Sequence, residues 1–116
     1  MIKGIGIDAV ELDRIEKIIR EKKSFTARVL TTNELMLFND LTLHRQIEFL
    51  AGRYACKEAF SKAWGTGIGK VNFQQIEILK NEFGAPIVTK SPHKGNVFVT
   101  ITHTDTVAIA QILLED

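Results

Sequence analysis

Charged side chains suited to binding a phosphorylated ligand are concentrated in residues 52–69, which read GRYACKEAFSKAWGTGIG. Arg53 and Lys57 share one face of the helix expected here, where like charges at this spacing repel by roughly 0.2–0.5 kcal/mol. We therefore predict that an anionic group lies between them. Glu58 lies beside this basic face, and Lys62 follows one turn later. A carboxylate among cations, followed by glycines, suits a phosphate that arrives with a divalent metal ion.

A second carboxylate, Asp8, follows a short N-terminal segment in which glycine alternates with isoleucine. In a strand, Gly4, Gly6 and Asp8 would point to one side and the isoleucines to the other. Glycine weakens a strand unless something approaches its backbone closely, so Asp8 is predicted to end the strand on this open side. With Glu58 it would form an oxygen-only site that leaves positions for water and phosphate, which is how magnesium is usually held.

Each candidate residue also has a structural explanation. Asp8 taken alone is better explained as a helix cap, and Glu58 with Lys62 forms a favourable pair within a helix. His103 ends a predicted strand, where histidine most often hydrogen-bonds locally, and Cys56 is expected to be a small core residue. The sequence shows no Ser-His-Asp or Cys-His arrangement and no Cys/His spacing typical of a metal site.

Two glycine motifs are rejected as nucleotide-binding fingerprints. Residues 4–9 match the loose pattern G-x-G-x-x-A, but no strand-helix-strand unit is predicted around them. Asp8 within that loop would also repel a pyrophosphate unless a cation intervened. Residues 65–70 resemble a P-loop only in composition, because they follow a helix and no Ser or Thr comes after Lys70.

The order of the helices and strands that must position these residues predicts an α+β fold, in which an N-terminal strand and helices pack on a small antiparallel sheet. Thr31 and Glu34 have the spacing of a capping box, and Gly65 is expected to cap the long helix at its C-terminus. The last strand is apolar on both faces, so it should be central in the sheet. The predicted strands are residues 1–8, 73–79, 86–89, 97–103 and 107–114, and the predicted helices are residues 11–23, 25–30, a short one opening at 31, and 43–64.

Length and composition indicate a single domain spanning residues 1–116, with 45% hydrophobic and 25% charged residues. A net charge of +1 excludes a wholesale nucleic-acid binder but leaves room for a local basic patch. A lone cysteine cannot form an internal disulfide, no apolar run is long enough for a membrane span, and glycines interrupt any signal peptide. We therefore expect a cytoplasmic enzyme or binding domain, without nucleic-acid or membrane partners.

The helix expected at residues 11–23 has a strongly basic outer surface, formed by Arg14, Lys17, Arg20, Lys22 and Lys23. Such charge runs are most often only a solvated face. The alternative is a docking surface for an acidic partner, which long-range attraction would bring in faster. The helix dipole favours basic residues near this C-terminal end in either case.

Three segments in the same order strongly resemble those of holo-acyl-carrier-protein synthases, the small trimeric class of 4′-phosphopantetheinyl transferases: GIGIDAVELDRI, EFLAGRYACKEAFSKAWGTGIG and VTITHTDTVAIAQ. The resemblance covers nearly the full length. It implies a 4′-phosphopantetheinyl transferase-like fold and a Mg²⁺-dependent transfer of 4′-phosphopantetheine from coenzyme A to a serine of apo acyl carrier protein. Adenosine 3′,5′-bisphosphate would be released, the role would be fatty acid biosynthesis, and a homotrimer would form the sites at subunit interfaces.

The resemblance also implies roles for individual residues. Asp8 and Glu58 match the magnesium ligands, and with Lys62 they form the implied catalytic set. Ile18, Glu21 and Ser24 depart from the docking face of some family members, so Lys17 and Arg20 are expected to take over there. The implied coenzyme A contacts are Arg53, Ser61, Lys62, Gly65, His103 and, near the adenine, Pro86; the implied carrier-docking residues are Arg14, Lys17, Arg20, Arg28 and Arg45.

The implied reaction needs charge neutralisation at the pyrophosphate, which the metal and Lys62 would supply. It also needs a base for the serine hydroxyl; a water on the metal, Glu58 and another group all remain candidates. Two other functions compete with this one. A non-catalytic coenzyme A or nucleotide-binding module would not need both carboxylates, and a regulatory protein that binds acidic partners would leave residues 53–69 unexplained.

Overall fold

The structure, a computed structural model, describes residues 1–65 and 70–116, so Gly67 and Gly69 of the expected phosphate loop lie outside the described residues. None of the described helices combines the length and the apolar character needed to cross a bilayer. The elements along the chain are β1 (Ile2–Glu11), α1 (Leu12–Glu21), α2 (Lys23–Val29), α3 (Thr32–Asn39), α4 (Leu43–Trp64), a 3₁₀ turn (Phe73–Gln75), β2 (Glu77–Lys80), β3 (Pro86–Lys90), β4 (Asn96–His103) and β5 (Val107–Glu115).

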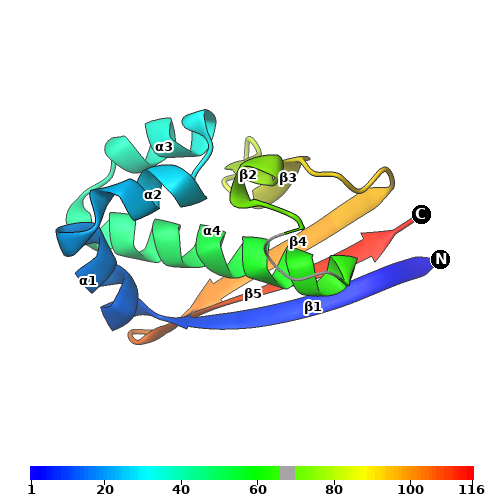
Figure 1. The fold of residues 1–116 in the computed structure, drawn as a ribbon, viewed down its shortest axis with the longest axis horizontal. Coiled ribbons are helices and arrows are strands. Elements are labelled where there is room, and N and C mark those ends of the chain that lie inside the picture. Colours follow the sequence, from blue (N-terminus) through cyan, green and yellow to red (C-terminus); the bar gives the residue numbers. More distant parts are fainter. Residues whose placement is uncertain (66–69) are drawn as a thin grey trace.

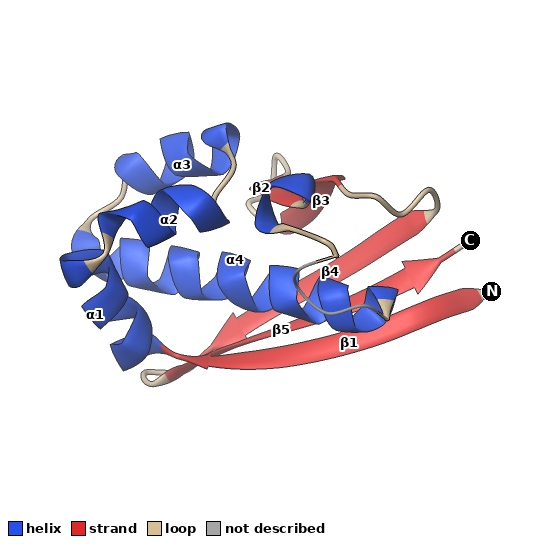
Figure 2. Cartoon of the chain, in the orientation of Figure 1, coloured by secondary structure: helices blue, strands red, loops and turns tan. Residues whose placement is uncertain are grey.

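The strands form a three-stranded antiparallel sheet in the order β1-β5-β4 and a separate β2–β3 hairpin (Figure 2). The α+β class is therefore confirmed, and β5 occupies the central position predicted from its apolar faces. Ala108, Ala110, Ile112 and Leu114 of β5 point to the buried side. The hairpin lies beside β4, above α4 in the view of Figure 1, and is not hydrogen-bonded to the main sheet.

The long helix α4 lies across the inner face of the sheet, and α1, α2 and α3 gather around its N-terminal half (Figure 1). Close packing of α4 on β1 explains the alternating glycines. A Cβ added at Gly4 would collide with the carbonyl of Ala63, and one at Gly6 with the carbonyl of Ala59. The side of β1 that the glycines leave open is therefore occupied by the helix backbone, with Asp8 further along the same side.

The prediction that Asp8 ends the first strand is wrong, and so is its interpretation as a helix cap. β1 continues to Glu11, and Asp8 lies within the ladder opposite Ala110. The N-cap position of α1 is Glu11, which makes no side-chain capping bond. Pairing with the central strand β5 continues β1 past Asp8 to Glu11. The Asp8 carboxylate therefore does not cap a helix.

The core and the helix ends agree with the sequence pattern. Leu50, Cys56 and Phe60 of α4 are fully buried, and burial raises the pKa of the Cys56 thiol to about 12, which confirms it as a core residue. Gly65 caps α4 with a φ of +89°, and its N–H bonds to the Ser61 carbonyl. Thr31 forms the predicted capping box at the start of α3.

The strand predicted at residues 73–79 forms only from Glu77 onward. Phe73–Gln75 is a 3₁₀ turn, because Asn72 accepts a hydrogen bond from the Gln74 N–H while the Gln75 side chain accepts one from the Asn72 N–H. Side chains that bond to nearby backbone compete with strand formation. This local capping therefore overrides the alternating apolar pattern.

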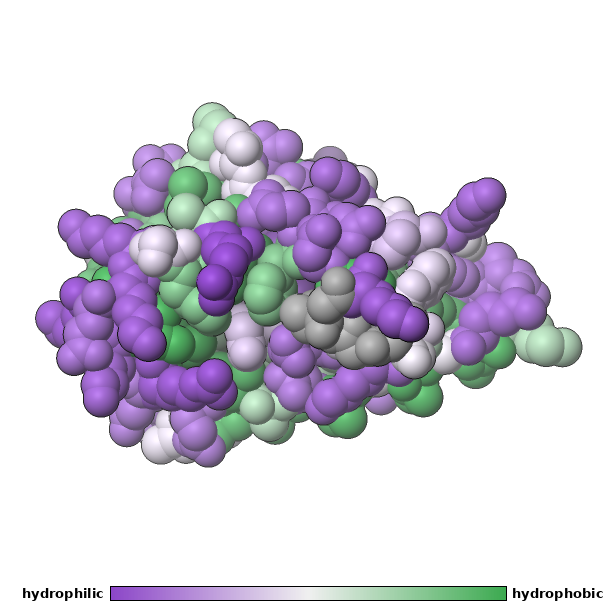
Figure 3. All heavy atoms as spheres, in the orientation of Figure 1, coloured by the Kyte–Doolittle hydropathy of each residue, from purple (hydrophilic) through white to green (hydrophobic). Residues whose placement is uncertain are grey.

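The outer face of the three-stranded sheet, opposite α4, carries exposed apolar side chains. Ile5 is 59% exposed, Ile7 is 56% exposed, and Phe98 on the far edge strand is 53% exposed. The register places Ile5 and Phe98 on either side of Leu113 in the central strand. Hydrophobic residues appear along the lower edge of the space-filling view, where β1 runs (Figure 3). A continuous apolar face of this kind is typical of a surface that packs against another chain.

Candidate active site

The structure brings Asp8, Glu58 and Lys62 together where β1 crosses α4. The Lys62 ammonium donates hydrogen bonds to Asp8 Oδ1, at 3.0 Å, and to the Ile7 carbonyl, at 2.9 Å. The purely helical explanation of Glu58 and Lys62 as an i,i+4 pair is therefore incomplete, because the lysine binds the carboxylate of a neighbouring strand. The lysine side chain is about half exposed, so it can also reach a ligand.

Glu58 lies in an electrostatic environment that disfavours its charge. Partial burial and, next, the nearby Asp8 carboxylate raise the pKa of Glu58, while Lys62 and Arg14 oppose the shift. Within the described residues, no third acidic, histidine or cysteine side chain joins the pair in a metal-binding group. Two adjacent carboxylates fit a magnesium ion, because a hard cation prefers oxygen ligands and would relieve their mutual repulsion.

Ser61 and Gly65 lie beyond this cluster toward the end of α4. Ser61 is 1% exposed, and its hydroxyl donates to the Glu58 carbonyl at 2.7 Å. This hydroxyl is engaged within the helix, whereas Gly65 is exposed at the helix end. In the single chain, Lys62 and Gly65 are therefore more accessible to a ligand than Ser61.

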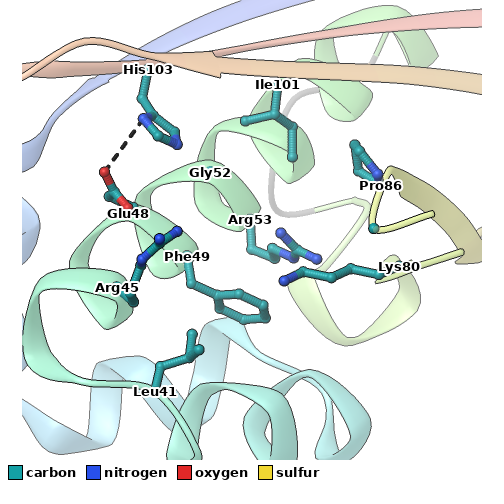
Figure 4. A pocket seen from close by; sticks show the side chains of 11 residues that line it. Leu41, Arg45, Glu48, Phe49, Gly52, Arg53, Lys80, Pro86, Ile101 and His103 are labelled. Carbon is teal, nitrogen blue, oxygen red and sulfur yellow. Dashed lines mark ion pairs between the residues drawn. The ribbon is translucent and has the colours of Figure 1, made fainter. Parts of the chain in front are cut away.

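A second group of the predicted residues lines a pocket between α4, the β2–β3 hairpin and the end of β4 (Figure 4). Arg53, Pro86 and His103, all expected to contact coenzyme A, meet there. Arg45 joins them, although it was expected among the docking residues, and Lys80 of β2 adds a further cation that the sequence did not single out. The remaining lining residues are Leu41, Glu48, Phe49, Gly52, Gly84 and Ile101.

Arg53 is the most constrained cation of this pocket. It is 5% exposed, its guanidinium carbon lies 4.0 Å from the centroid of the Phe49 ring, and its Nε donates to the Ile78 carbonyl at 3.1 Å. Burial lowers its pKa. Among the described residues its Nη2 has no hydrogen-bond partner, and a buried donor without a partner is costly. An anionic ligand in the pocket would supply that partner once the side chain shifted toward it.

His103 extends from β4 toward α4, where its Nδ1 lies 3.5 Å from Glu48 Oε2 (Figure 4). His44 Nε2 approaches the same oxygen at 3.7 Å. The imidazole therefore lies near a carboxylate of a different element, and Glu48 offsets part of the positive charge around the pocket.

The anionic group predicted with Arg53 and Lys57 is Glu34 of the same chain; burial lowers the pKa of both side chains, and the charge of Glu34 opposes that shift. Lys57 is fully buried and points away from the pocket toward α3. Its ammonium donates to Glu34 Oε1 at 2.6 Å and to the carbonyls of Val29 and Phe73 at 2.7 and 3.1 Å. The anion beside Lys57 thus belongs to the same chain. The capping-box spacing of Glu34 had indicated only a local role for this carboxylate.

The expected carrier-docking residues do not all line one groove. Arg14, Lys17 and Arg28 line a groove between α1 and α2, together with Lys22; we call these four residues the basic groove. Hydrophilic side chains cover this end of the molecule (Figure 3). Arg20 lies outside the groove and pairs with Glu16 at 3.1 Å, and Arg45 lies in the pocket described above.

Comparisons with known proteins show which sequences and folds this chain resembles. A family model described as the 4′-phosphopantetheinyl transferase superfamily matches residues 4–112. The chain is 70% identical over 115 residues to a holo-[acyl-carrier-protein] synthase of Enterococcus faecalis, a match that covers 99% of this chain and 98% of that protein.

Solved structures of similar proteins share the fold. A holo-(acyl-carrier-protein) synthase from Bacillus anthracis, crystallised in complex with CoA (3′,5′-ADP), is 46% identical with a TM-score of 0.92, over 99% of this chain and 97% of that one. A Helicobacter pylori holo-[acyl-carrier-protein] synthase in complex with coenzyme A is 37% identical with a TM-score of 0.83, over 96% and 99% of the two chains.

Proposed function

This chain belongs to the 4′-phosphopantetheinyl transferase superfamily, and we propose that it transfers 4′-phosphopantetheine from coenzyme A to a serine of apo acyl carrier protein. It is an enzyme of the holo-[acyl-carrier-protein] synthase type. The released product would be adenosine 3′,5′-bisphosphate, and the reaction would serve fatty acid biosynthesis in the cytoplasm. We assign this function to one catalytic domain spanning residues 1–116.

The observation that carries the proposal is the convergence of Asp8, Glu58 and Lys62 from two elements far apart in the sequence. Asp8 and Glu58 would hold Mg²⁺, which when bound neutralises negative charge on a pyrophosphate group. Lys62 is already directed at Asp8 and can donate a hydrogen bond to a phosphate oxygen at the same place. Stabilising charge where the bond to the leaving phosphate breaks is the main catalytic need of phosphoryl-group transfer.

The pocket supports the coenzyme A assignment independently. It combines the cationic groups of Arg45, Arg53 and Lys80 with the ring of His103 and apolar walls. An adenosine 3′-phosphate presents both an anion and a flat apolar base, so these side chains match its two parts. The Nη2 of Arg53 is buried and lacks a hydrogen-bond partner among the described residues, so it would donate to a phosphate oxygen after a shift of the side chain toward the pocket.

We also propose a homotrimer in which neighbouring chains complete each site. Asp8 lies on β1, His103 lies on β4, and β5 separates these two edge strands. The carboxylates and the pocket therefore lie at opposite edges of one sheet. The exposed apolar face that carries Ile5, Ile7 and Phe98 would be buried between chains, and closed three-fold symmetry would bring the carboxylates of one chain to the pocket of the next.

The direct test incubates the purified protein with coenzyme A, Mg²⁺ and apo acyl carrier protein and then weighs the carrier by mass spectrometry. We expect the carrier to gain the mass of one phosphopantetheine group, and we expect EDTA to prevent the gain and excess Mg²⁺ to restore it. Coenzyme A binding without any mass gain would favour the non-catalytic binding module. Transfer that persists in EDTA would exclude the magnesium assignment.

The basic groove is proposed as the docking surface for the acidic carrier, and two arginines of α1 allow a matched test. Arg14 lines the groove, whereas Arg20 lies outside it and pairs with Glu16. Arg14→Glu should raise the KM for carrier about tenfold or more, because it places a repulsive charge in the contact. It should leave the KM for coenzyme A near the wild-type value.

Arg20→Glu makes the same charge change on the same helix and should raise the KM for carrier much less. Added salt should weaken carrier binding to the wild type, because exposed charges are screened beyond about 8 Å at physiological ionic strength. Equal effects of the two substitutions on carrier binding would mean that only net charge matters. Equal effects of Arg14→Glu on both substrates would indicate general damage to the site.

A further inference from the structure

A buried polar network joins α3, α4 and β2 behind the pocket, and its centre is Glu34 of α3. Both Glu34 and Lys57 are fully buried, and they form an ion pair with an Nζ–Oε1 distance of 2.6 Å. Glu34 Oε1 also accepts the backbone N–H of Thr31 at 2.9 Å. Its other oxygen, Oε2, accepts the backbone N–H of Ile78 in β2 at 2.7 Å. Both carboxylate oxygens are thus committed to buried donors.

Ile78 connects this network to the pocket. Its N–H is held by Glu34, and its carbonyl accepts the Nε of Arg53 at 3.1 Å. Glu34 itself is not among the residues that line the pocket. The Arg53 guanidinium at the pocket is therefore held by a strand residue, and the Glu34 carboxylate in turn holds that residue through its N–H.

The same contact fixes one wall of the pocket. In the hairpin, Ile78 pairs with Val88, and Lys80 pairs with Pro86 two residues further along. Lys80 and Pro86 both line the pocket. The hairpin is not hydrogen-bonded to the main sheet. Besides the packing of β3 against β4, the hydrogen bonds of Ile78 to Glu34 of α3 and Arg53 of α4 help to determine where these side chains lie.

We propose that Glu34 is a positioning residue for coenzyme A recognition: by holding the Ile78 backbone of β2, it sets the orientation of the Arg53 guanidinium in the pocket. This inference rests on the proposed function, because it takes the pocket as the coenzyme A site. Lys57 balances the buried charge of Glu34 and thereby allows a carboxylate to occupy this place.

Glu34 must be a carboxylate because its two oxygens accept hydrogen bonds and neither needs to donate one. Three donors, Lys57 Nζ and the N–H groups of Thr31 and Ile78, converge on the two oxygens of Glu34. A glutamine offers one acceptor oxygen, and its NH₂ group can only donate. In Glu34→Gln, the NH₂ group must therefore face either the Ile78 N–H or the Lys57 ammonium. The first arrangement loses the hydrogen bond to Ile78, and the second loses the hydrogen bond to Lys57.

A neighbouring residue provides a matched control. Glu77 is also a buried carboxylate of the hairpin, but it accepts hydrogen bonds from the hydroxyls of Thr31 and Thr89, at 2.6 and 2.7 Å. A hydroxyl can rotate to accept as well as donate. Glu77→Gln can therefore keep both hydroxyl partners, and the Asn33 side chain, its further hydrogen-bond partner, also carries both a donor and an acceptor. The substitution makes the same chemical change in the same part of the fold.

The experiment measures the Kd for coenzyme A by calorimetry and the KM for each substrate, at temperatures well below the unfolding transition of every variant. Glu34→Gln should raise the Kd and the KM for coenzyme A about tenfold, which is the loss expected for a misplaced charged hydrogen bond. The KM for carrier should stay near the wild-type value, and Glu77→Gln should leave the Kd for coenzyme A near that of the wild type. Similar Kd values for Glu34→Gln and Glu77→Gln would overturn the proposal.

A double-mutant cycle with Arg53→Ala distinguishes positioning from a general structural effect. If Glu34 acts through Arg53, Glu34→Gln should weaken coenzyme A binding much less in the Arg53→Ala background than in the wild type. Fully additive losses would contradict the proposal. The wild type serves as the reference for the proposed function. If the wild type transfers phosphopantetheine but the cycle is additive, only the role of Glu34 fails; if the wild type does not bind coenzyme A, the proposed function fails.

Discussion

Replacing either Asp8 or Glu58 with alanine should reduce phosphopantetheine transfer by three or more orders of magnitude while the fold remains intact. Transition-state charge stabilisation by a bound metal ion contributes several kcal/mol, and each 1.4 kcal/mol corresponds to about a factor of ten in rate. The two carboxylates are the only acidic pair that the described residues place beside Lys62. Transfer is measured by the mass of the carrier after a timed incubation with excess Mg²⁺.

The thermal stability of these variants provides a second readout. The raised pKa of Glu58 means that its charged form is less favourable in the folded than in the unfolded chain. At neutral pH the Glu58→Ala variant should therefore unfold at the wild-type temperature or slightly above it. Asp40→Ala removes an exposed carboxylate at the end of α3 and should leave transfer unchanged. Near-normal turnover in either active-site variant would contradict the proposed two-carboxylate site.

Placing a charge on the outer face of the sheet should dissociate the proposed trimer. Phe98 is 53% exposed in the single chain, so aspartate at this position costs little in an isolated subunit. In a trimer, the same carboxylate would be buried against an apolar neighbour, which is strongly unfavourable. Sedimentation should show three chains for the wild type and single chains with greatly reduced transfer for Phe98→Asp.

Phe83→Asp is the matched control for this substitution. Phe83 is 86% exposed but lies in the turn of the hairpin, away from the three-stranded sheet, so its replacement should leave assembly intact. A wild-type protein that sediments as a fully active monomer would refute the trimer. Equal dissociation by both substitutions would show that the outer sheet face is not the specific contact.

Mixed trimers test whether neighbouring chains share a site. Glu58 lies on the side of α4 that meets β1, and His103 lies on the opposite edge strand. Inactive Glu58→Ala and inactive His103→Ala chains, unfolded and refolded together, should therefore regain part of the activity, because some interfaces would pair two intact contributions. If mixed trimers form but remain inactive, Glu58 and His103 do not serve a shared site in neighbouring chains.

Several features of the fold were predictable because they depend on short segments of sequence. β5 has a strand hydrogen-bonded to each of its edges, as its sequence predicts. A strand whose two faces are both apolar is better buried in the centre of a sheet than at its edge. Gly65 ends α4 because a glycine accepts the positive φ of a helix C-cap at low cost. Thr31 and Glu34 form a capping box because both partners lie within one turn. The family was also evident from three sequence motifs, and the comparisons confirm it.

The errors arose where a local signal competed with long-range pairing. Asp8 resembles a helix cap, but the ladder between β1 and β5 carries the strand past it. The apolar alternation at residues 73–79 resembles a strand, yet the capping of Asn72 forms a 3₁₀ turn there. In each case the competing energies are small, about 1 kcal/mol for a cap or a hydrogen bond, so a short window cannot determine which arrangement prevails.

The amino-acid sequence by itself determined the family, the element order and the carboxylates and cations available for chemistry. Only the tertiary structure decided which of those charges face a ligand. Arg53 and Lys57 share a helix and a charge, but Arg53 enters the pocket whereas Lys57 is neutralised by Glu34 from another helix. A buried charge is stable only when a group of opposite charge or a hydrogen-bond partner lies beside it. For Lys57 that group is Glu34, and its position depends on how α3 and the hairpin pack against α4.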